Sequence, residues 1–393
     1  MKNVHKQWAL RLLSTPNFGQ KLRSAGSLPV SLLLTLLIGF AVAACQDHAI
    51  PSGPSSMQFP GQNIQSNGPK PSWGPDITPQ MLAVINELSV LAPVPIQNVT
   101  PDQARKTPSF KDAVNSLLDK NGIARPMANV TISERTITGY GGAPLRAKIY
   151  TPNNVSGPYP VIVYFHGGGW VIANADVYEY STLALSQSTG AVVVSVDYRL
   201  APENKFPTAH MDAFAAYKWV TNNMSALNGN GKIAVAGESA GGNMAVTVSM
   251  MARDSNLTNK PRHILSVFPV ANNNLYTYSY NAYADAKPLS RPGVMFFTKN
   301  YFNSDADGDS PLISLTDVAN LSNLPPVTIV GAEIDPLQTE GMELRDKLKG
   351  LGNDVSYQLY KGVTHEFFGM YAIVPEAQQA QAFAATRLIA SFK

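Results

Sequence analysis

The stretch IAVAGESAGGNMAV, residues 233–246, places a single serine among residues that have almost no side chain. An apolar run of strand length leads into the turn at Ser239, and a helical pattern follows it. Either the backbone turns too sharply for bulkier neighbours, or another group must come very close to the serine. A strand, a G-x-S-x-G turn and a helix form the setting in which a serine is exposed as a nucleophile. A glycine-rich turn that binds a phosphate is the alternative interpretation.

Short apolar runs alternate with helical patterns on both sides of this stretch. The runs of strand length are residues 160–168, 191–200, 232–239, 263–270 and 325–333, and the clearest helical patterns between them are residues 177–190 and 208–223. A segment at 130–152 alternates and turns as a β-hairpin does. Continuous apolar strands that alternate with helices predict a mainly parallel sheet covered on both faces. Ligand sites in such folds lie beyond the C-terminal ends of the strands.

The composition is that of a globular protein with a large core. Of 393 residues, 45% are hydrophobic and 15% are charged, and the formal net charge is +3. Five of the 30 basic residues precede Asp47, the first acidic residue, so from position 45 onward 25 basic residues face 27 acidic ones, which gives −2. Residues 45–393 are therefore close to neutral in net charge. Proteins that bind nucleic acid carry a clustered basic face, which this composition does not suggest, so we expect no nucleic-acid partner.

The N-terminal segment resembles the signal of a bacterial lipoprotein. A basic stretch precedes the apolar residues 28–44, and the run ends in Val-Ala-Ala before Cys45, the only cysteine in the chain. This pattern predicts a signal peptide over 1–44 and lipidation of Cys45 with palmitate-type acyl chains, which anchor a protein stably in a membrane. In such lipoproteins Gln46, in place of Asp, favours the outer membrane of the cell envelope. The Pro-, Gly- and Ser-rich residues 45–75 predict a flexible tether, and 76–393 the folded domain.

A nucleophilic serine needs a histidine base, and that base needs an orienting acid. The six histidines allow elimination: His365 alone lies in a loop after the last strand-like run, and the other five are His5, His48, His166, His210 and His263. The acid is expected after a strand between the serine and the histidine. Asp335, which precedes a proline and therefore stays in a loop, is favoured over Glu333. The aspartate-rich run 305–310 is interpreted as a solvated loop, because its glycine is misplaced for a calcium site.

The segment HGGGW, residues 166–170, follows a predicted strand and offers backbone N–H groups for an oxyanion. Its consecutive glycines allow the backbone to approach a substrate closely. We expect the N–H groups of Gly168, Gly169 and Ala240 to form the oxyanion hole, with Gly167 a weaker candidate. Trp170 is expected to serve packing.

Taken together these motifs resemble the hormone-sensitive-lipase-like esterases of the α/β-hydrolase superfamily. The residues that carry the resemblance are HGGGW at 166–170, DYRLAPE at 197–203, GESAGG at 237–242, DPL at 335–337 and the late His365. The resemblance implies an eight-stranded α/β-hydrolase sheet with a helical cap formed partly by residues 76–125. It implies Ser239 as nucleophile, Asp335 as acid and His365 as base, acting on short- to medium-chain esters without metal or cofactor. Many relatives carry Gly after the histidine, whereas Glu366 stands here, either shifting the pKa of the base or facing solvent.

Two other classes of function remain open at this point. An amide or carbamate hydrolase would use the same three side chains, and relative rates on a matched ester and amide would separate it from an esterase. A non-catalytic binding module with a relic hydrolase fold would be expected to lack one of the three. Whether the chain is a monomer or a homodimer is also left open by the sequence.

Overall fold

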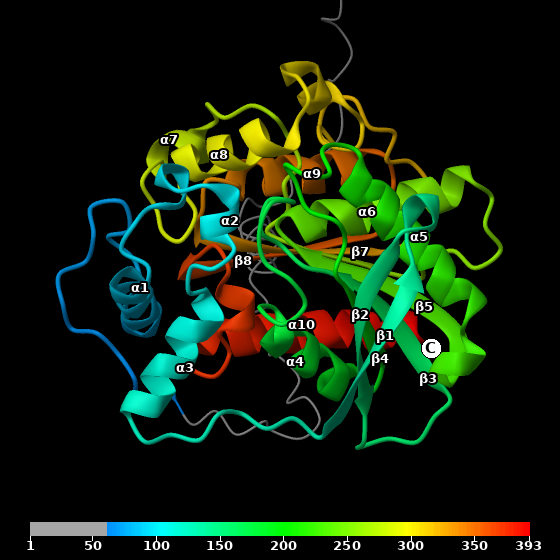
Figure 1. Ribbon diagram of the computed structural model, residues 1–393, viewed down its shortest axis with the longest axis horizontal. Coiled ribbons are helices and arrows are strands. Elements are labelled where there is room, and N and C mark those ends of the chain that lie inside the picture. The colour runs from blue at the N-terminus through cyan, green and yellow to red at the C-terminus, as the bar shows by residue number, and fades with distance from the viewer. Residues whose placement is uncertain (1–60) are drawn as a thin grey trace, which may run out of the picture. The chain divides into compact units, whose positions relative to one another are not determined.

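The computed structural model describes residues 61–393, which form an eight-stranded sheet with helices on both faces (Figure 1). The strands are β1 (Val130–Thr138), β2 (Pro144–Pro152), β3 (Tyr159–Phe165), β4 (Val192–Val196), β5 (Gly229–Glu238), β6 (Ile264–Val267), β7 (Val327–Ile334) and β8 (Val355–Thr364). Their order is β1-β2-β4-β3-β5-β6-β7-β8. The hairpin β1–β2 is antiparallel and β2 joins β4 antiparallel, whereas all other pairs are parallel. The predicted fold class is thereby confirmed.

Alternation along the central strand β3 divides the core into two layers. Ile162 and Tyr164 pack on one side of the sheet, whereas Val161, Val163 and Phe165 pack on the other. Such a strand, buried on both faces, requires a continuous apolar run. In Figure 1, α4 (Glu179–Thr189) and α10 (Pro375–Ser391) lie below the sheet, and α6 (Ala240–Asp254) and α9 (Gln338–Gly350) lie above it, on the same side as α5 (Thr208–Asn222).

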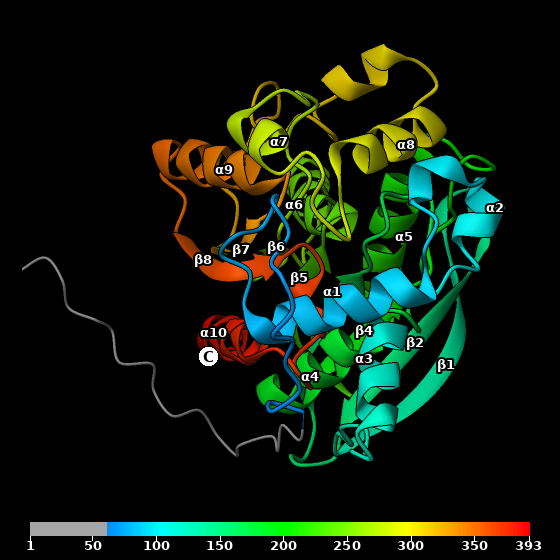
Figure 2. The same ribbon diagram turned by 90° about the vertical axis from the view of Figure 1, so that its left-hand side faces the viewer.

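Two groups of helices cover one end of the sheet (Figure 2). They are α1 (Pro79–Leu91), α2 (Pro101–Ala104) and α3 (Phe110–Lys120) from the N-terminal segment, and α7 (Tyr278–Ala282) and α8 (Arg291–Tyr301) from the connection after β6. The helix α3 begins at a capping box, in which Ser109 and Asp112 satisfy each other's backbone N–H groups. Residues Pro79–Asn98 are apolar and long enough to cross a membrane by composition alone. The helix α1 nevertheless buries Met81 and Val84 completely within the domain.

The tether predicted over residues 45–75 is wrong for the part that the structure describes. The N–H of Gly61 donates to the carbonyl of Ala372 at 3.1 Å, and Ile64 is buried in the core. A side chain at position 61 would overlap Ala372, so the glycine allows close backbone contact rather than flexibility. The folded domain therefore includes residues 61–75. The signal peptide, Cys45 and the remainder of the tether lie outside the described residues.

Candidate active site

Ser239 stands at the sharp turn between β5 and α6, and its backbone explains the small residues around it. Its φ of 57° and ψ of −118° lie far from helix or strand values. Its N–H donates to the carbonyl of Val267 at 2.9 Å, which fixes the turn against the neighbouring strand. A side chain at Gly241 would overlap the carbonyl of Phe165, and one at Gly237 would overlap Gly241. Both conditions suggested by the sequence hold here, because the turn is sharp and the backbones are in close contact.

His365 and Asp335 follow the ends of two adjacent parallel strands, β8 and β7, and their side chains meet. The Nδ1 atom of His365 lies 2.7 Å from Oδ2 of Asp335. Both are buried, with side-chain exposures of 3% and 1%. The other candidate acid, Glu333, instead accepts a hydrogen bond from the N–H of Gly362 at 2.8 Å. The structure thus pairs the histidine with the acid that the sequence favoured.

The other histidines of the described residues have different partners. The ring of His210 is buried between the hydroxyl of Tyr301 and the side chain of Asn243, at 2.8 and 2.9 Å. The ring of His263 contacts the hydroxyls of Ser391 and Thr328, at 2.8 and 2.9 Å. His166 bonds the carbonyl of Gly167 through Nδ1 at 2.8 Å. None of these three has a carboxylate partner within the described part of the chain, in contrast to His365. His5 and His48 lie outside that part.

The glycine segment after β3 curls beside Ser239. Gly168 has a φ of 92°, in the left-handed region that a side chain disfavours. Within residues 61–393, the N–H groups of Gly168, Gly169 and Ala240 donate to no protein acceptor. These three N–H groups, at the first turn of α6 and in the neighbouring loop, are therefore available to donate hydrogen bonds to an oxygen that develops negative charge. Trp170 stacks on Tyr301 with ring centroids 4.7 Å apart, which is a packing contact.

The loop after β4 supports this segment directly. The Tyr198 hydroxyl donates to the carbonyls of His166 and Gly167 at 2.9 and 3.2 Å, and its ring stacks on the His166 ring. The N–H of Ala201 donates to the carbonyl of Trp170 at 2.9 Å. These contacts fix the backbone on both sides of the glycines, so the donors are held in place before a substrate arrives.

Arg105, which follows α2, connects the cap to the same segment and was not singled out from the sequence. Its guanidinium forms a two-pronged ion pair with Glu203 at 2.8 and 2.6 Å. Its Nε donates to the carbonyl of Val171 at 2.9 Å, and Nη2 donates to that of Ala201 at 2.6 Å. The planar guanidinium can satisfy all these acceptors at once, which a lysine cannot do. A sequence signal was lacking, because the residues that Arg105 joins are 66 to 98 positions away.

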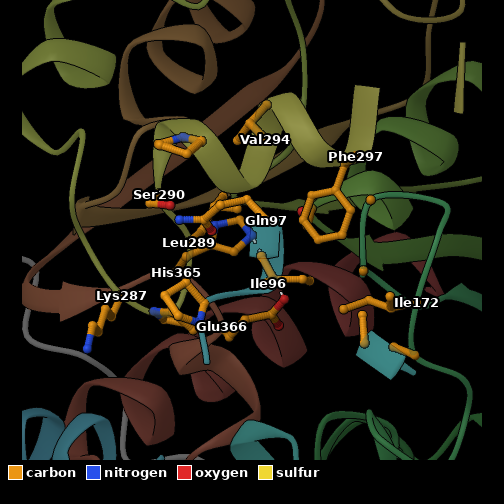
Figure 3. Close-up of a pocket in the computed structure, with 18 of the residues that line it drawn as sticks. Ile96, Gln97, Ile172, Lys287, Leu289, Ser290, Val294, Phe297, His365 and Glu366 are labelled. Atoms are coloured by element: carbon orange, nitrogen blue, oxygen red, sulfur yellow. Dashed lines mark ion pairs between the residues drawn. The ribbon is translucent and has the colours of Figure 1, made fainter. Parts of the chain in front are cut away.

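A cavity of about 360 Å3 lies between the cap and the ends of the strands. Ser239, His365, Gly168 and Gly169 are among the residues that line it, and Figure 3 shows apolar side chains around it. Those that line the cavity include Ile96, Ile172, Leu289, Val294 and Phe297. A largely apolar cavity with a few convergent polar groups is the usual form of a small-molecule site.

Two further carboxyl groups act on His365 through their charge. The expectation that Glu366 faces solvent is wrong. Its side chain is only 12% exposed, and it accepts a hydrogen bond from the Tyr178 hydroxyl at 2.7 Å. Glu238, before the serine, accepts one from the Tyr164 hydroxyl and is fully buried. Burial raises the pKa of both glutamates, and the charge of Glu366 raises that of Glu238 further.

These charges determine the direction in which His365 titrates. Burial by itself lowers the pKa of His365, but the charge and hydrogen bond of Asp335 raise it, and the charge of Glu366 adds to the increase. The net pKa lies above the usual 6.5. An imidazole placed in this way holds a proton more strongly than a free one, which suits a group that must carry a proton between two reacting atoms.

No group of three or more potential metal ligands lies together among residues 61–393. The aspartate-rich run interpreted as a solvated loop forms a short 3-10 helix, Asp305–Asp309. Its Asp307 accepts hydrogen bonds from the backbone and side chain of Asn303, at 2.6 and 2.9 Å.

Comparison with known proteins agrees with this architecture. A family model described as alpha/beta hydrolase fold matches residues 162–369, more than half of the chain. Carboxylesterase NlhH of Mycobacterium tuberculosis is 34% identical over 261 residues, which are 65% of this chain and 81% of that protein. An arylesterase of Saccharolobus solfataricus is 34% identical over 266 residues, which are 66% of this chain and 84% of that protein.

Solved esterase structures superpose on most of the described domain. The hyperthermophilic esterase of the archaeon Pyrobaculum calidifontis aligns with a TM-score of 0.71 at 34% identity, over 80% of this chain and 98% of that one. A thermostable esterase from Pseudomonas putida aligns with a TM-score of 0.74 at 29% identity, over 81% and 98%. The chain therefore belongs to the alpha/beta hydrolase fold family, in agreement with its resemblance to the hormone-sensitive-lipase-like esterases.

Proposed function

We propose that this protein is a serine carboxylic-ester hydrolase that acts through Ser239, His365 and Asp335. The observation that carries the proposal is the His365–Asp335 pair, 2.7 Å apart, together with the cavity that His365 and Ser239 both line. With Nδ1 bonded to Asp335, the Nε2 atom is left to exchange protons with the serine and the substrate. The esterase names of the similar proteins support the same reaction class.

The proposed reaction has two halves. His365 takes the proton of Ser239 while the serine oxygen attacks the ester carbonyl carbon, and the N–H groups of Gly168, Gly169 and Ala240 hold the oxyanion. Collapse of this intermediate breaks the ester bond, and His365 gives its proton to the leaving alcohol oxygen. Water then attacks the acyl-enzyme, and the same proton transfers release the carboxylic acid and free Ser239.

The cavity supports short- to medium-chain acyl esters as substrates. Apolar side chains of the cap form most of its wall, so an acyl chain can be buried there without leaving polar groups unpaired. A volume of about 360 Å3 limits how much of a long chain can enter.

The direct test is the hydrolysis of p-nitrophenyl esters, from acetate to palmitate, by the full chain in detergent. We expect rates to peak at short or medium chains. In Ser239→Ala, kcat should fall on the order of 10⁶-fold, as when a triad serine is removed elsewhere. Equal activity in the folded Ser239→Ala variant would exclude this serine as the nucleophile.

We further propose that Cys45 is lipidated and anchors the enzyme in the outer membrane. The support is the sequence alone: a basic stretch, an apolar run, Val-Ala-Ala before a sole cysteine, and Gln46 after it. Labelled palmitate should be incorporated by cells that express the wild type and not by cells that express Cys45→Ser. Release of wild-type protein into the soluble fraction would contradict the anchor.

Light scattering of the detergent-solubilised protein would distinguish a monomer from the homodimer that the sequence leaves open.

A further inference from the structure

A carboxyl oxygen of Glu366 lies near Nε2 of His365, the ring nitrogen that would exchange protons with the serine and the substrate. Oε1 of Glu366 is 3.9 Å from Nε2, while Nδ1 is occupied by Asp335. A separation of 3.9 Å is too long for a direct hydrogen bond. One water molecule that donates both O–H groups joins two acceptors roughly 4.4 Å apart when each hydrogen bond is about 2.8 Å, so a slightly bent bridge spans this separation.

The Glu366 side chain is held at this position by the fold. The buried Tyr178 hydroxyl donates to Oε1 at 2.7 Å, so this oxygen is an acceptor whether or not the carboxyl is protonated. Glu366 also has a φ of 70°, a left-handed conformation that glycine adopts more readily. A glutamate kept in a strained backbone position at the edge of the cavity suggests a use for its side chain. Figure 3 shows it beside the His365 ring.

The second half of the reaction must select a nucleophile. A water molecule has two O–H groups, so it can give one to Nε2 of His365 and the other to Oε1 of Glu366. An alcohol has a single O–H, which it must give to Nε2 in order to be activated. Its alkyl group would then take the place of the second O–H and leave Oε1 without that hydrogen bond. The arrangement therefore distinguishes water from alcohols by the number of donors.

We propose that Glu366 is a water-positioning residue, which holds the deacylating water between Oε1 and His365 Nε2 and so favours hydrolysis over acyl transfer to alcohols. The proposal rests on the function proposed above. The water oxygen attacks the acyl carbon and one of its protons passes to Nε2, while the carbonyl electron pair moves onto the oxygen. On collapse the bond to Ser239 Oγ breaks, Nε2 returns the proton to Oγ, and the acid leaves. With an alcohol the same steps release an ester.

The test is the competition between water and methanol for one acyl-enzyme. The full chain in detergent is given p-nitrophenyl butyrate and a methanol series, and butyrate and methyl butyrate are quantified. Both products come from the same intermediate, so their ratio does not depend on the acylation rate. In Glu366→Gly, which suits the backbone conformation, we expect the ratio of methyl butyrate to butyrate to rise about tenfold, the effect of losing a hydrogen bond to a charged or buried acceptor.

Three other variants separate the held water from general effects. Glu366→Gln keeps an acceptor oxygen for the water and should stay within about threefold of the wild-type ratio. Tyr178→Phe leaves the carboxyl group but removes the hydroxyl that fixes it, and should give an intermediate rise. Asp285→Asn removes another acidic group that lines the cavity and should leave the ratio unchanged.

An unchanged ratio in a folded Glu366→Gly variant would overturn the proposal. An equal rise in Asp285→Asn would also overturn it, because any loss of negative charge would then have the same effect. If neither the wild type nor Glu366→Gly forms methyl butyrate, Glu366 does not control the choice of nucleophile. Failure of the proposed function is distinguishable, since p-nitrophenol release would then persist in Ser239→Ala.

Discussion

Nδ1 of His365 and Oδ2 of Asp335 lie 2.7 Å apart, although the two residues are 30 positions apart in the chain. The parallel pairing of β7 with β8 produces this contact, because it aligns the C-terminal ends of the two strands. Asp335 also accepts the N–H of Leu337 at 2.9 Å through its other oxygen, so its orientation is fixed from both sides. The acid therefore determines which nitrogen of His365 faces the cavity.

Asp335→Asn should lower kcat by about 10⁴-fold with little change in folding, because an amide fails to hold the required imidazole tautomer. Glu333→Gln is the matched control, since Glu333 lies two residues away and bonds the backbone at Gly362 instead. Steady-state kinetics on p-nitrophenyl butyrate measures both variants. A large loss in Glu333→Gln with near-normal activity in Asp335→Asn would reverse the assignment of the acid.

The pH dependence of kcat/KM should report the raised pKa of His365. The base acts in its neutral form, so activity is lost as pH falls through this pKa, and the acid limb should have its midpoint above 6.5. Glu366→Gln removes a nearby negative charge and should move the midpoint to lower pH. A profile from about pH 5 to 9 with a short-chain ester provides the measurement. A wild-type midpoint at or below 6.5 would contradict the prediction.

Gly241→Ala should destabilise the domain by about 3 kcal/mol or more, because the added methyl group overlaps backbone that has no room to move. Gly341→Ala offers a contrast within α9, where nothing lies within 4 Å of the new methyl group. There the substitution should raise the free energy of unfolding by about 0.5–1 kcal/mol, because alanine makes the unfolded chain less flexible than glycine does. Urea unfolding measures the stability of both variants. Similar unfolding midpoints for Gly241→Ala and Gly341→Ala would contradict the prediction that the added methyl group overlaps backbone at position 241.

Arg105→Ala should reduce kcat/KM about tenfold, because the backbone that follows the proposed oxyanion donors loses a charged hydrogen bond at Val171, and the loop that supports it loses another at Ala201. Lys106→Ala serves as the neighbouring control. Lys106 pairs with Asp102 on the surface, where the two side chains are 73% and 71% exposed, and such pairs contribute little. Kinetics should therefore separate the two positions, and an equal effect of both changes would show that the contacts of Arg105 with the glycine segment are unimportant.

Much of the fold and of the candidate site followed from local sequence. Continuous apolar strands predicted a parallel sheet, because only a strand buried on both faces, such as β3, needs such a run. Chain order and loop position separated His365 from the other histidines. The close contacts at Gly237 and Gly241 were also foreseeable, since small residues on both sides of one serine indicate a sharp turn or a close approach of two backbone segments.

Only the tertiary structure decided the surroundings of these groups. The inward position of Glu366, the Tyr178 hydroxyl that holds it, and the reach of Arg105 all depend on elements that are distant in sequence. Residues 61–75 have the composition of a tether, yet Gly61 and Ile64 pack on the domain because a matching surface exists there. Periodicity and turn chemistry are properties of neighbouring residues, so the sequence by itself determined the elements, the sharp turn at Ser239 and the order of the candidate groups. Side-chain partners are chosen by which strands and helices become neighbours in space, and that information arises only when the chain folds.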